Sequence, residues 1–320
     1  MSIRVEQGGL LTTVQDMGRT NYQQYGMVVA GVLDPRAAAL ANFLVGNGEN
    51  EAVLEVSLLG PRLLFTQDNC IALTGGDLGA ELDGAPVPRY AAVPVRSGQT
   101  LSFTGPKSGC RAYLAFAGGL DIPVVMGSRS TYLKAQLGGF QGRQLKAGDE
   151  IAFRAPRPFL PKMSKRRLTE AASSLTLRVI LGPQDDAFTP EGLETFLSSE
   201  YTLTSQFDRM GCRLDGPVIA HRAGADILSD GISFGAVQVP SNGKPILMLA
   251  DRQTVGGYTK IACVISADFS ALAQAKAGDR FRFEAVAMEQ AQALYIAQRQ
   301  ELEAIDRRFN AGVFRRLFHR

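Results

Sequence analysis

Short hydrophobic runs separated by turn residues dominate the chain. The runs lie at residues 52–59, 62–66, 70–75, 110–119, 175–182, 244–250 and 260–266. Glycine, proline, aspartate and asparagine separate them, and the totals of 34 glycines and 15 prolines fit many tight turns. Runs of this length between turn residues are typical of buried β-strands. The pattern therefore predicts that strands outnumber helices.

Helices are fewer and are marked by capping residues. Residues 34–46 begin with Asp34 as N-cap and Pro35 at the first helical position, and they stop at Gly46. Thr189 and Pro190 repeat this arrangement at the start of residues 189–199. Further helices are predicted at residues 266–275 and 287–309, of which the second is the long one. We expect a mainly β chain with a few helices, of the α+β class.

The chain carries signs of two related domains. Residues 154–171 are proline-rich and basic without periodicity, as in an interdomain linker. "LKAGDEIAF" at 145–153 and "AKAGDRFRF" at 275–283 share Lys, Ala, Gly, Asp and Phe in register. Each would close its half of the chain. The predicted ranges are an N-terminal β domain at 1–155, a linker at 156–172, a C-terminal β domain at 173–290, and a C-terminal helix with a basic tail at 291–320.

Composition narrows the class of protein. The 320 residues are 45% hydrophobic and 20% charged, as expected of a soluble globular protein. A net charge of +3 is too small to indicate a nucleic-acid partner. No apolar run approaches the ~20 residues of a membrane span, and we expect no signal peptide because the first residues lack an apolar segment. Four scattered cysteines without CxxC fit free thiols and no metal site. We expect a cytoplasmic protein with no membrane or nucleic-acid partner.

Several familiar catalytic motifs are absent from the sequence. It contains neither a GxxxxGK[ST] phosphate-binding loop nor a GxSxG nucleophile elbow. His221 is the only histidine outside the last two residues, so a Ser-His-Asp triad would have to use it. A structural role for that histidine is the stronger interpretation. Candidate chemistry must therefore come from polar clusters punctuated by glycine.

Two such clusters lie in the first half of the chain. Residues 10–34 gather several polar side chains, among which Arg19 and Asp34 are candidates for substrate binding. Local turn and cap bonding is the alternative, and it accounts well for Asp34. Residues 128–131 (Ser128, Arg129, Ser130 and Thr131) surround the start of a possible short helix, where hydroxyls and amides favour an anion. A plain Ser/Thr N-cap is the alternative there.

Three more clusters lie in the second half. Arg209 offers donors suited to carboxylate or carbonyl oxygens, unless it forms a structural pair with an aspartate. Gln238 sits inside an apolar strand, where an amide is costly unless a ligand or another backbone satisfies it. The stretch "LADRQTVGGYTK" at 249–260 ends a strand in hydrogen-bonding side chains followed by two glycines. Its alternative interpretation is an Asp251–Arg252 pair, a glycine turn and a core tyrosine.

Together these clusters predict one polar cleft built from loops of both halves. Arg209 would orient a carboxylate or carbonyl oxygen, and Gln238 and Thr254 would bond the amide of a small substrate. We therefore assign catalytic roles to these three residues and no metal ligands. The predicted substrate-binding residues are Arg19, Asp34, Ser128, Arg129, Ser130, Thr131, Gln253, Gly256, Gly257 and Tyr258.

Ordered sequence blocks resemble one known family. "TTVQDMGR", "LEVSLLGP", "GGLDIPVVMGSRST", "LGGFQGRQLKAGD", "DRMGCRL", "GAVQVPSNGKPI" and "DRQTVGGYTKIACVIS" look like signature blocks of the biotin-dependent carboxyltransferase/allophanate hydrolase subunit 2-like family. The resemblance covers about residues 3 to 290. That family includes the KipA proteins, the C subunit of 5-oxoprolinase and part of the carboxyltransferase domain of urea amidolyase. Val255 stands where threonine is frequent, which bears on the subfamily more than on the family.

The resemblance implies both a fold and an activity. It implies two cyclophilin-like β-barrel domains and a role as the C subunit of an ATP-dependent 5-oxoprolinase, which cleaves 5-oxo-L-proline to L-glutamate. The implied partners are the A subunit and a KipI-like B subunit of that enzyme. ATP would be used by the complex, and no cofactor would be bound by this chain, which alone would be inactive. Two alternatives stay open: a carboxyltransferase subunit using biotin on a separate chain, and a non-catalytic KipA-type regulator of a KipI-like kinase inhibitor.

Overall fold

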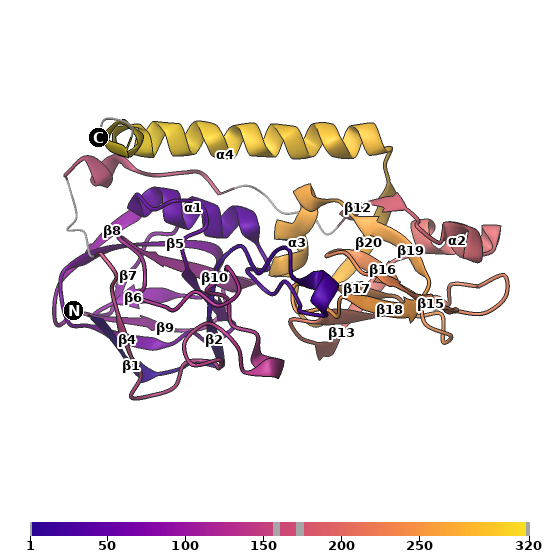
Figure 1. Cartoon of the computed structure of the whole chain (residues 1–320), viewed down its shortest axis with the longest axis horizontal. Coiled ribbons are helices and arrows are strands. Elements are labelled where there is room, and N and C mark those ends of the chain that lie inside the picture. Colours follow the sequence, from indigo (N-terminus) through magenta and orange to yellow (C-terminus); the bar gives the residue numbers. More distant parts are fainter. Residues whose placement is uncertain (1, 156–160, 171–175, 318–320) are drawn as a thin grey trace. The chain divides into compact units, whose positions relative to one another are not determined.

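The computed structural model describes residues 2–155, 161–170 and 176–317 (Figure 1). This part of the chain is mainly β with four α-helices, which confirms the predicted fold class. Two compact units divide the chain. The first unit combines residues 1–18, 34–171 and 299–320, and the second combines residues 19–33 and 172–298. Each unit therefore takes segments from distant parts of the sequence.

The first unit contains two β-sheets. Their strand orders are β11-β1-β4-β9-β6-β7 and β2-β3-β10-β5-β8. The strands are β1 (Ser2–Gln7), β2 (Leu11–Gln15), β3 (Val53–Ser57), β4 (Arg62–Phe65), β5 (Asn69–Asp77), β6 (Ala80–Leu82), β7 (Ala85–Pro86), β8 (Ala92–Val95), β9 (Thr100–Phe103), β10 (Ser108–Phe116) and β11 (Glu150–Ala152). Fully buried side chains such as Val14, Leu54, Phe65 and Leu114 belong to one hydrophobic cluster that both sheets share. This cluster is the core of the first unit.

Helix α1 (Pro35–Val45) packs against β5 and β10 of the first unit (Figure 1). It begins as predicted, because the Asp34 carboxylate accepts a hydrogen bond from the Ala37 amide at 2.9 Å. Gly46 ends the helix in the left-handed conformation, with φ of 83°. Helix α4 (Met288–Leu317) starts one residue after its predicted beginning. Leu302 of α4 is buried in one cluster with apolar residues of α1.

The second unit is built on a closed barrel. Its strand order is β12-β19-β16-β17-β14-β13-β20. The strands are β12 (Thr176–Leu181), β13 (Tyr201–Phe207), β14 (Gly211–Asp215), β16 (Ala236–Gln238), β17 (Ile246–Met248), β19 (Lys260–Val264) and β20 (Arg280–Ala285). Parallel pairing of β12 with β20 closes the barrel, for example Thr176 with Arg282. The closed barrel encloses an apolar core that includes Leu177, Val237 and Phe281.

Smaller elements surround the barrel strands. Helices α2 (Pro190–Ser198) and α3 (Phe269–Gln274) match two predicted helices. Strands β15 (Asp226–Gly231) and β18 (Val255–Tyr258) pair with each other as a separate two-stranded ribbon. The short 3-10 helices are η1 (Gln23–Tyr25), η2 (Leu133–Ala135), η3 (Pro161–Lys165), η4 (Asp185–Ala187) and η5 (Ser266–Asp268).

The repeated sequence "KAGD" forms the same turn in both units. Gly148 and Gly278 take left-handed φ values of 90° and 91°. In each unit the following aspartate, Asp149 or Asp279, accepts a hydrogen bond from the lysine amide three residues earlier, at 2.9 and 3.0 Å. Each turn leads into the last strand of its unit, β11 or β20. The segment repeated in the sequence therefore has the same local structure in both units.

The bounds of the two compact units differ from the predicted domain ranges in two places. Residues 19–33, including η1, belong to the second unit, and the indigo segment lies beside the orange barrel strands in Figure 1. The reason is apolar packing, because Leu33 is fully buried in the barrel cluster. Residues 299–320 belong to the first unit rather than forming a separate tail. Of the predicted linker, residues 161–170 contain η3, and its other residues lie outside the described part.

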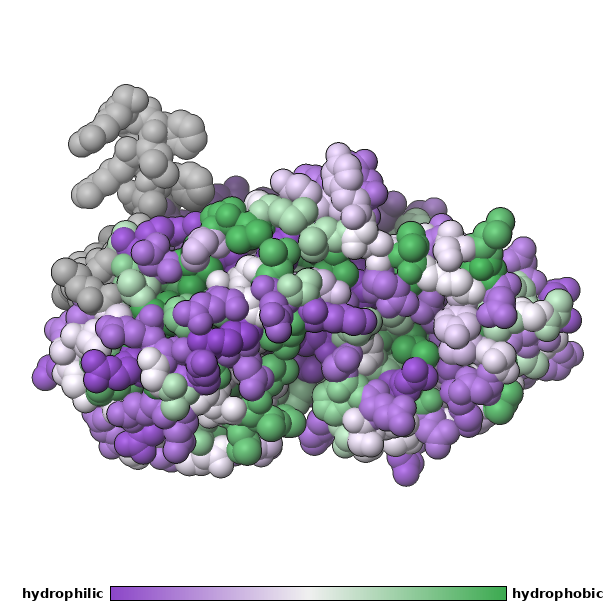
Figure 2. All heavy atoms as spheres, turned by 60° about the horizontal axis from the view of Figure 1, so that its bottom comes forward, coloured by the Kyte–Doolittle hydropathy of each residue, from purple (hydrophilic) through white to green (hydrophobic). Residues whose placement is uncertain are grey.

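Hydrophobic stretches in the described residues are too short or too polar for a transmembrane helix, and α4 does not qualify. On the face drawn in Figure 2, hydrophobic residues form small groups among hydrophilic ones.

Candidate functional site

Arg209 lies on the turn between β13 and β14 and forms a buried ion pair. Its Nε and Nη2 donate to the two carboxylate oxygens of Asp251 at 3.1 and 3.0 Å. Nη2 also donates to the Gly31 carbonyl oxygen. The side chains of Arg209 and Asp251 are 5% and 6% exposed, so water screens the pair little. The guanidinium thus ties together three segments of the second unit.

Arg252, the next residue after Asp251, does not form the pair that was the alternative prediction. Its Nε donates to the Ile232 carbonyl at 2.9 Å and its Nη1 to the Leu249 carbonyl at 3.1 Å. Burial lowers the pKa of Arg252 to about 10. The charged side chains at 251 and 252 therefore hold the loop that follows β17, each through a different partner.

The Gln238 cluster, which comprises Gln238, Gln253 and Gly256, brings two side-chain amides together. Gln238 is 2% exposed, and its Nε2 has no hydrogen-bond partner among the described residues. A β-carbon added at Gly256 would lie 3.1 Å from Gln238 Nε2 and 3.5 Å from Gln253 Nε2. Both amide nitrogens thus lie close to the bare backbone at Gly256. A buried donor without a partner costs free energy, which a ligand oxygen would recover.

A buried lysine beside this cluster was not singled out from the sequence. Lys260 begins β19, pairs in register with Gln238, and is 2% exposed. Its Nζ donates to an Asp230 carboxylate oxygen at 2.9 Å, and this hydrogen bond lowers the pKa of Asp230. Gln184 contacts both residues, through its Nε2 to Asp230 and its Oε1 from the Lys260 amide. The signal in the sequence was a lysine opening the apolar run 260–266.

The hydroxyls predicted around residue 128 bind a carboxylate of the protein itself. Ser128 and Ser130 each donate to Asp16 Oδ1 at 2.6 Å, and the Arg129 amide donates to Oδ2 at 2.6 Å. The Gly18 amide also donates to Oδ1, at 2.9 Å. Asp16 is 2% exposed, and these hydrogen bonds satisfy both of its carboxylate oxygens. Within the first unit, the Asp16 carboxylate thus occupies the position that was predicted for an external anion.

The other predicted residues fall into two groups. In the first unit, Asp34 caps α1, and the Thr131 hydroxyl donates to the Val14 carbonyl at 2.9 Å. In the second unit, Arg19 is fully buried, and the half-buried Thr254 accepts a backbone hydrogen bond from Ile232. Gly257 and Tyr258 lie in β18, and Tyr258 is exposed.

The geometry of the second unit suits hydrogen bonding to a small polar group. Gln238 supplies a donor in an enclosed position, while the Arg209–Asp251 pair and Arg252 fix the neighbouring loop. No cluster of three or more potential metal-ligating side chains exists among the residues that the structure describes. The ring of His221 packs at a tilt against that of Phe188, with centroids 4.6 Å apart, and its Nε2 lies 3.1 Å from the Val239 carbonyl oxygen. That arrangement is structural.

Comparison with known proteins decides the family. Residues 25–285 match the family described as carboxyltransferase domain, subdomain A and B. The chain belongs to this family. The resemblance read from the sequence blocks is thereby confirmed.

Two bacterial relatives of the carboxyltransferase-domain chain match over most of their length. This chain is 39% identical to the 5-oxoprolinase C subunit of Escherichia coli (strain K12), over 90% of this chain and 93% of that protein. The protein of the same name from Haemophilus influenzae is 38% identical, over 87% of this chain and 89% of that protein. Urea amidolyase of Saccharomyces cerevisiae is 31% identical over 95% of this chain, which spans only 18% of that protein.

Solved structures of related chains share the fold. Urea amidolyase of K. lactis superposes with a TM-score of 0.88 and 29% identity, over 95% of this chain and 20% of that one. The protein TTHA0988 superposes with a TM-score of 0.81 and 35% identity, over 88% of this chain and 55% of that one. The carboxyltransferase-domain chain thus corresponds to one part of longer polypeptides in both structures.

Proposed function

We propose that the chain is the C subunit of an ATP-dependent 5-oxoprolinase complex that cleaves 5-oxo-L-proline to L-glutamate. The observation that carries this proposal is the match to the 5-oxoprolinase C subunit of Escherichia coli, which covers 93% of that protein at 39% identity. A match over 90% of this chain includes most of both compact units. The complex would work in the cytoplasm.

The relatives are named as the C subunit of an enzyme, and such a name indicates further chains. We infer that the partners are the A subunit and a KipI-like B subunit. TTHA0988 supports a partner of this kind, because the chain accounts for only 55% of that longer polypeptide. The sequence has no phosphate-binding loop motif, so the ATP that the reaction consumes would be hydrolysed on another subunit. The isolated chain is therefore expected to be inactive.

Gln238 is the residue that we propose to contact the substrate. The ring of 5-oxoproline contains an amide whose carbonyl oxygen accepts hydrogen bonds, and Gln238 Nε2 is a buried donor without a partner in the described part of the chain. A donor fixed in advance at that oxygen favours charge that develops there during ring opening. Arg209 would act differently, since its donors already bind Asp251 and Gly31. We propose that it positions the loop 249–254.

Reconstitution tests the proposal. The chain is co-expressed with candidate A and B subunits, and 5-oxoproline-dependent release of glutamate and ADP is measured. Activity is expected only when all three chains are present. Robust hydrolysis by this chain alone would contradict the requirement for the A and B subunits. An assembled complex without activity would contradict the assignment of 5-oxoproline as the substrate.

A second candidate function is carboxyl transfer from biotin held on a separate chain. It is favoured by the urea amidolyase structure, which superposes over 95% of this chain with a TM-score of 0.88. The discriminating experiment supplies the assembled complex with a carboxylated biotin carrier and with urea. Loss of the carboxyl group from the carrier, without turnover of 5-oxoproline, would favour this second function over the first.

A further inference from the structure

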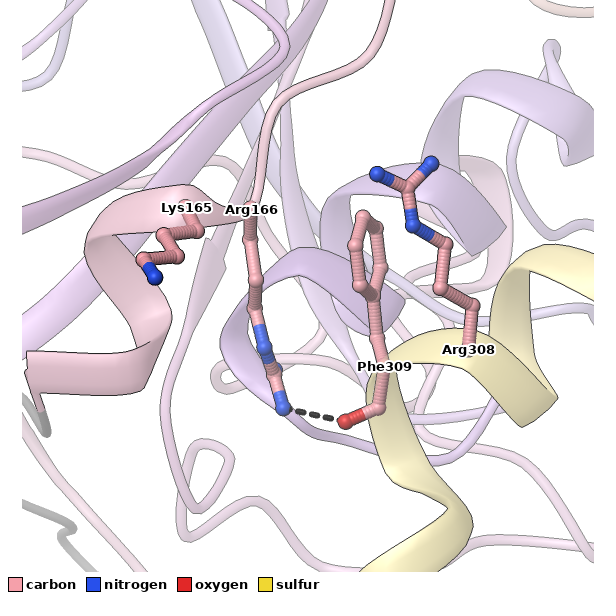
Figure 3. Close-up of a pocket in the computed structure, with 4 residues that line it drawn as sticks. All are labelled: Lys165, Arg166, Arg308 and Phe309. Carbon is pink, nitrogen blue, oxygen red and sulfur yellow. Dashed lines mark hydrogen bonds between the residues drawn. The ribbon is translucent and has the colours of Figure 1, made fainter.

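A basic pocket lies in the first unit, and none of the residues that line it is a predicted site residue (Figure 3). Its volume is about 220 Å³, and the described residues that line it are Lys165, Arg166, Arg308 and Phe309. Lys165 ends η3, Arg166 follows it, and the other two residues belong to α4. Three of these four residues carry a positive charge, and none carries a negative one. Two segments about 140 residues apart in the sequence thus combine their charges at one place.

Arg166 is the fixed part of this basic pocket. It is 8% exposed, and its Nη1 donates to the carbonyls of Phe43 and Leu44 at 3.1 and 2.9 Å. Its Nη2 donates to the Phe309 carbonyl, the bond drawn in Figure 3. These acceptors are all neutral carbonyls, so the guanidinium keeps its full charge without a carboxylate. Burial accordingly lowers the pKa of Arg166.

The Phe309 ring joins two guanidinium groups. Arg166 Cζ lies 5.4 Å from the ring centroid and Arg308 Cζ lies 5.3 Å from it. Contacts of this kind are cation–π interactions, which orient a guanidinium without neutralising it. The aromatic ring therefore organises the basic pocket without occupying the hydrogen-bond donors of Arg308.

Two other arginines near α4 are paired with carboxylates, whereas Lys165 and Arg308 of the basic pocket have no such partner among the described residues. Arg299 of α4 donates from its Nη2 to Glu49 at 3.1 Å, and Arg36 donates to Glu301 of α4 at 2.9 Å. Neither Lys165 nor Arg308 has an ion pair or hydrogen bond to a side chain in the described residues. The capping of α1 explains Arg166, whereas Lys165 and Arg308 are exposed charges beside it that take no part in this capping.

We propose that the basic pocket binds a phosphate group, either as inorganic phosphate or as part of a nucleotide. A single carboxylate would compensate one of three positive charges, whereas a phosphate carries about −1.5 to −2 and three acceptor oxygens. Guanidinium forks match those oxygens with two parallel hydrogen bonds. The pocket has room for such a group. This inference goes beyond the proposed function and does not rest on it.

The test is a calorimetric titration of the full chain in the absence of 5-oxoproline. Inorganic phosphate, ADP and ATP are added in separate arms at constant ionic strength, with sodium chloride as the blank. The double variant Lys165→Ala/Arg308→Ala removes the two uncompensated charges. Arg307→Ala is the matched control, because Arg307 neighbours Arg308 but does not line the pocket, and its Nε donates to the Glu303 carbonyl of its own helix.

Saturable binding of phosphate to the wild type is expected, weakened about tenfold or more in the double variant and less than twofold in Arg307→Ala. Tighter binding of ADP and ATP than of phosphate would identify a nucleotide, and equal binding would identify free phosphate. The proposal is overturned if no arm saturates, or if Arg307→Ala weakens binding as much as the double variant does. Should the double variant lose its far-UV circular dichroism, the single variant Arg308→Gln decides by the same criteria.

Discussion

Arg209 holds Asp251 through two parallel hydrogen bonds, in a pair that water hardly reaches. The two residues are 42 positions apart, and the same guanidinium binds the carbonyl of Gly31, 178 positions away. One side chain therefore fixes the loop after β17 and the segment 19–33 on the barrel. The same guanidinium places a positive charge directly against the buried carboxylate of Asp251.

Replacing Arg209 should consequently unfold the second unit more readily. Arg209→Ala removes two hydrogen bonds and the guanidinium charge from the buried Asp251 carboxylate, which costs about 3–5 kcal/mol in the free energy of unfolding. Arg213→Ala is the control, since Arg213 is exposed on β14 and its loss should change stability by about 0.5 kcal/mol or less. Urea denaturation followed by circular dichroism measures both. Unchanged stability with lost activity would instead support direct substrate binding by Arg209.

Gln238 should behave in the opposite way. Gln238→Met keeps a similar volume and removes a donor that has no partner in the described part of the chain, so the free energy of unfolding should fall by less than about 1.5 kcal/mol. In the reconstituted complex, kcat/KM for 5-oxoproline should drop roughly 5- to 150-fold, because the substrate carbonyl loses a buried hydrogen bond worth about 1–3 kcal/mol. A stable variant with full activity would remove Gln238 from the site.

Adjacent glycines in β18 should differ in tolerance. A β-carbon at Gly256 would lie 2.6 Å from Cδ1 of the buried Ile232, whereas at Gly257 the nearest atom is 3.4 Å away. Gly256→Ala should therefore lower stability by about 1–3 kcal/mol through overpacking. Gly257→Ala should stay within about 0.5 kcal/mol of the wild type. Thermal unfolding of the two variants side by side checks the difference, and equal melting temperatures would contradict the tight packing at Gly256.

His221 should make the fold sensitive to mild acid. Burial lowers the pKa of His221 in the folded chain, below the value of about 6.5 expected when unfolded. Between these two values the unfolded chain binds more protons, so stability is fully present above about pH 6.5 and declines as the pH falls through the folded pKa. His221→Gln should flatten the dependence of the melting temperature on pH between about 7.5 and 5. A variant with the same slope as the wild type would assign the acid sensitivity to carboxylates.

Local signals allowed much of the fold to be predicted from the sequence. Asp34, Pro35 and Gly46 mark the ends of α1 because capping depends on neighbouring residues only. The same holds for the Gly148 and Gly278 turns, whose positive φ values a glycine adopts without strain. Short apolar runs became strands for a similar reason, since their length and turn residues are read directly along the chain.

Partners distant along the chain could not be predicted in this way. Ser128 and Ser130 looked like donors for an external anion, but their acceptor is Asp16, 112 and 114 residues away. An Arg–Asp pair was an open alternative for Arg209, yet the sequence did not show which aspartate would be its partner. The sequence indicated that an amide at Gln238 would be costly without a partner. The close approach of the Gly256 backbone to Gln238 Nε2 is evident only in the folded chain.

The interleaving of the two units has a consequence for the order of synthesis. Residues 19–33 leave the ribosome early, but they pack with barrel strands that end at residue 285. The side of α1 that contacts Leu302 is likewise covered only after residues beyond 298 have been made. During translation the nascent chain must keep both the segment around Leu33 and the apolar side of α1 exposed until nearly all 320 residues have emerged. A gene cut at the midpoint would therefore yield two incomplete products, and separately expressed halves are expected to aggregate unless they are made together.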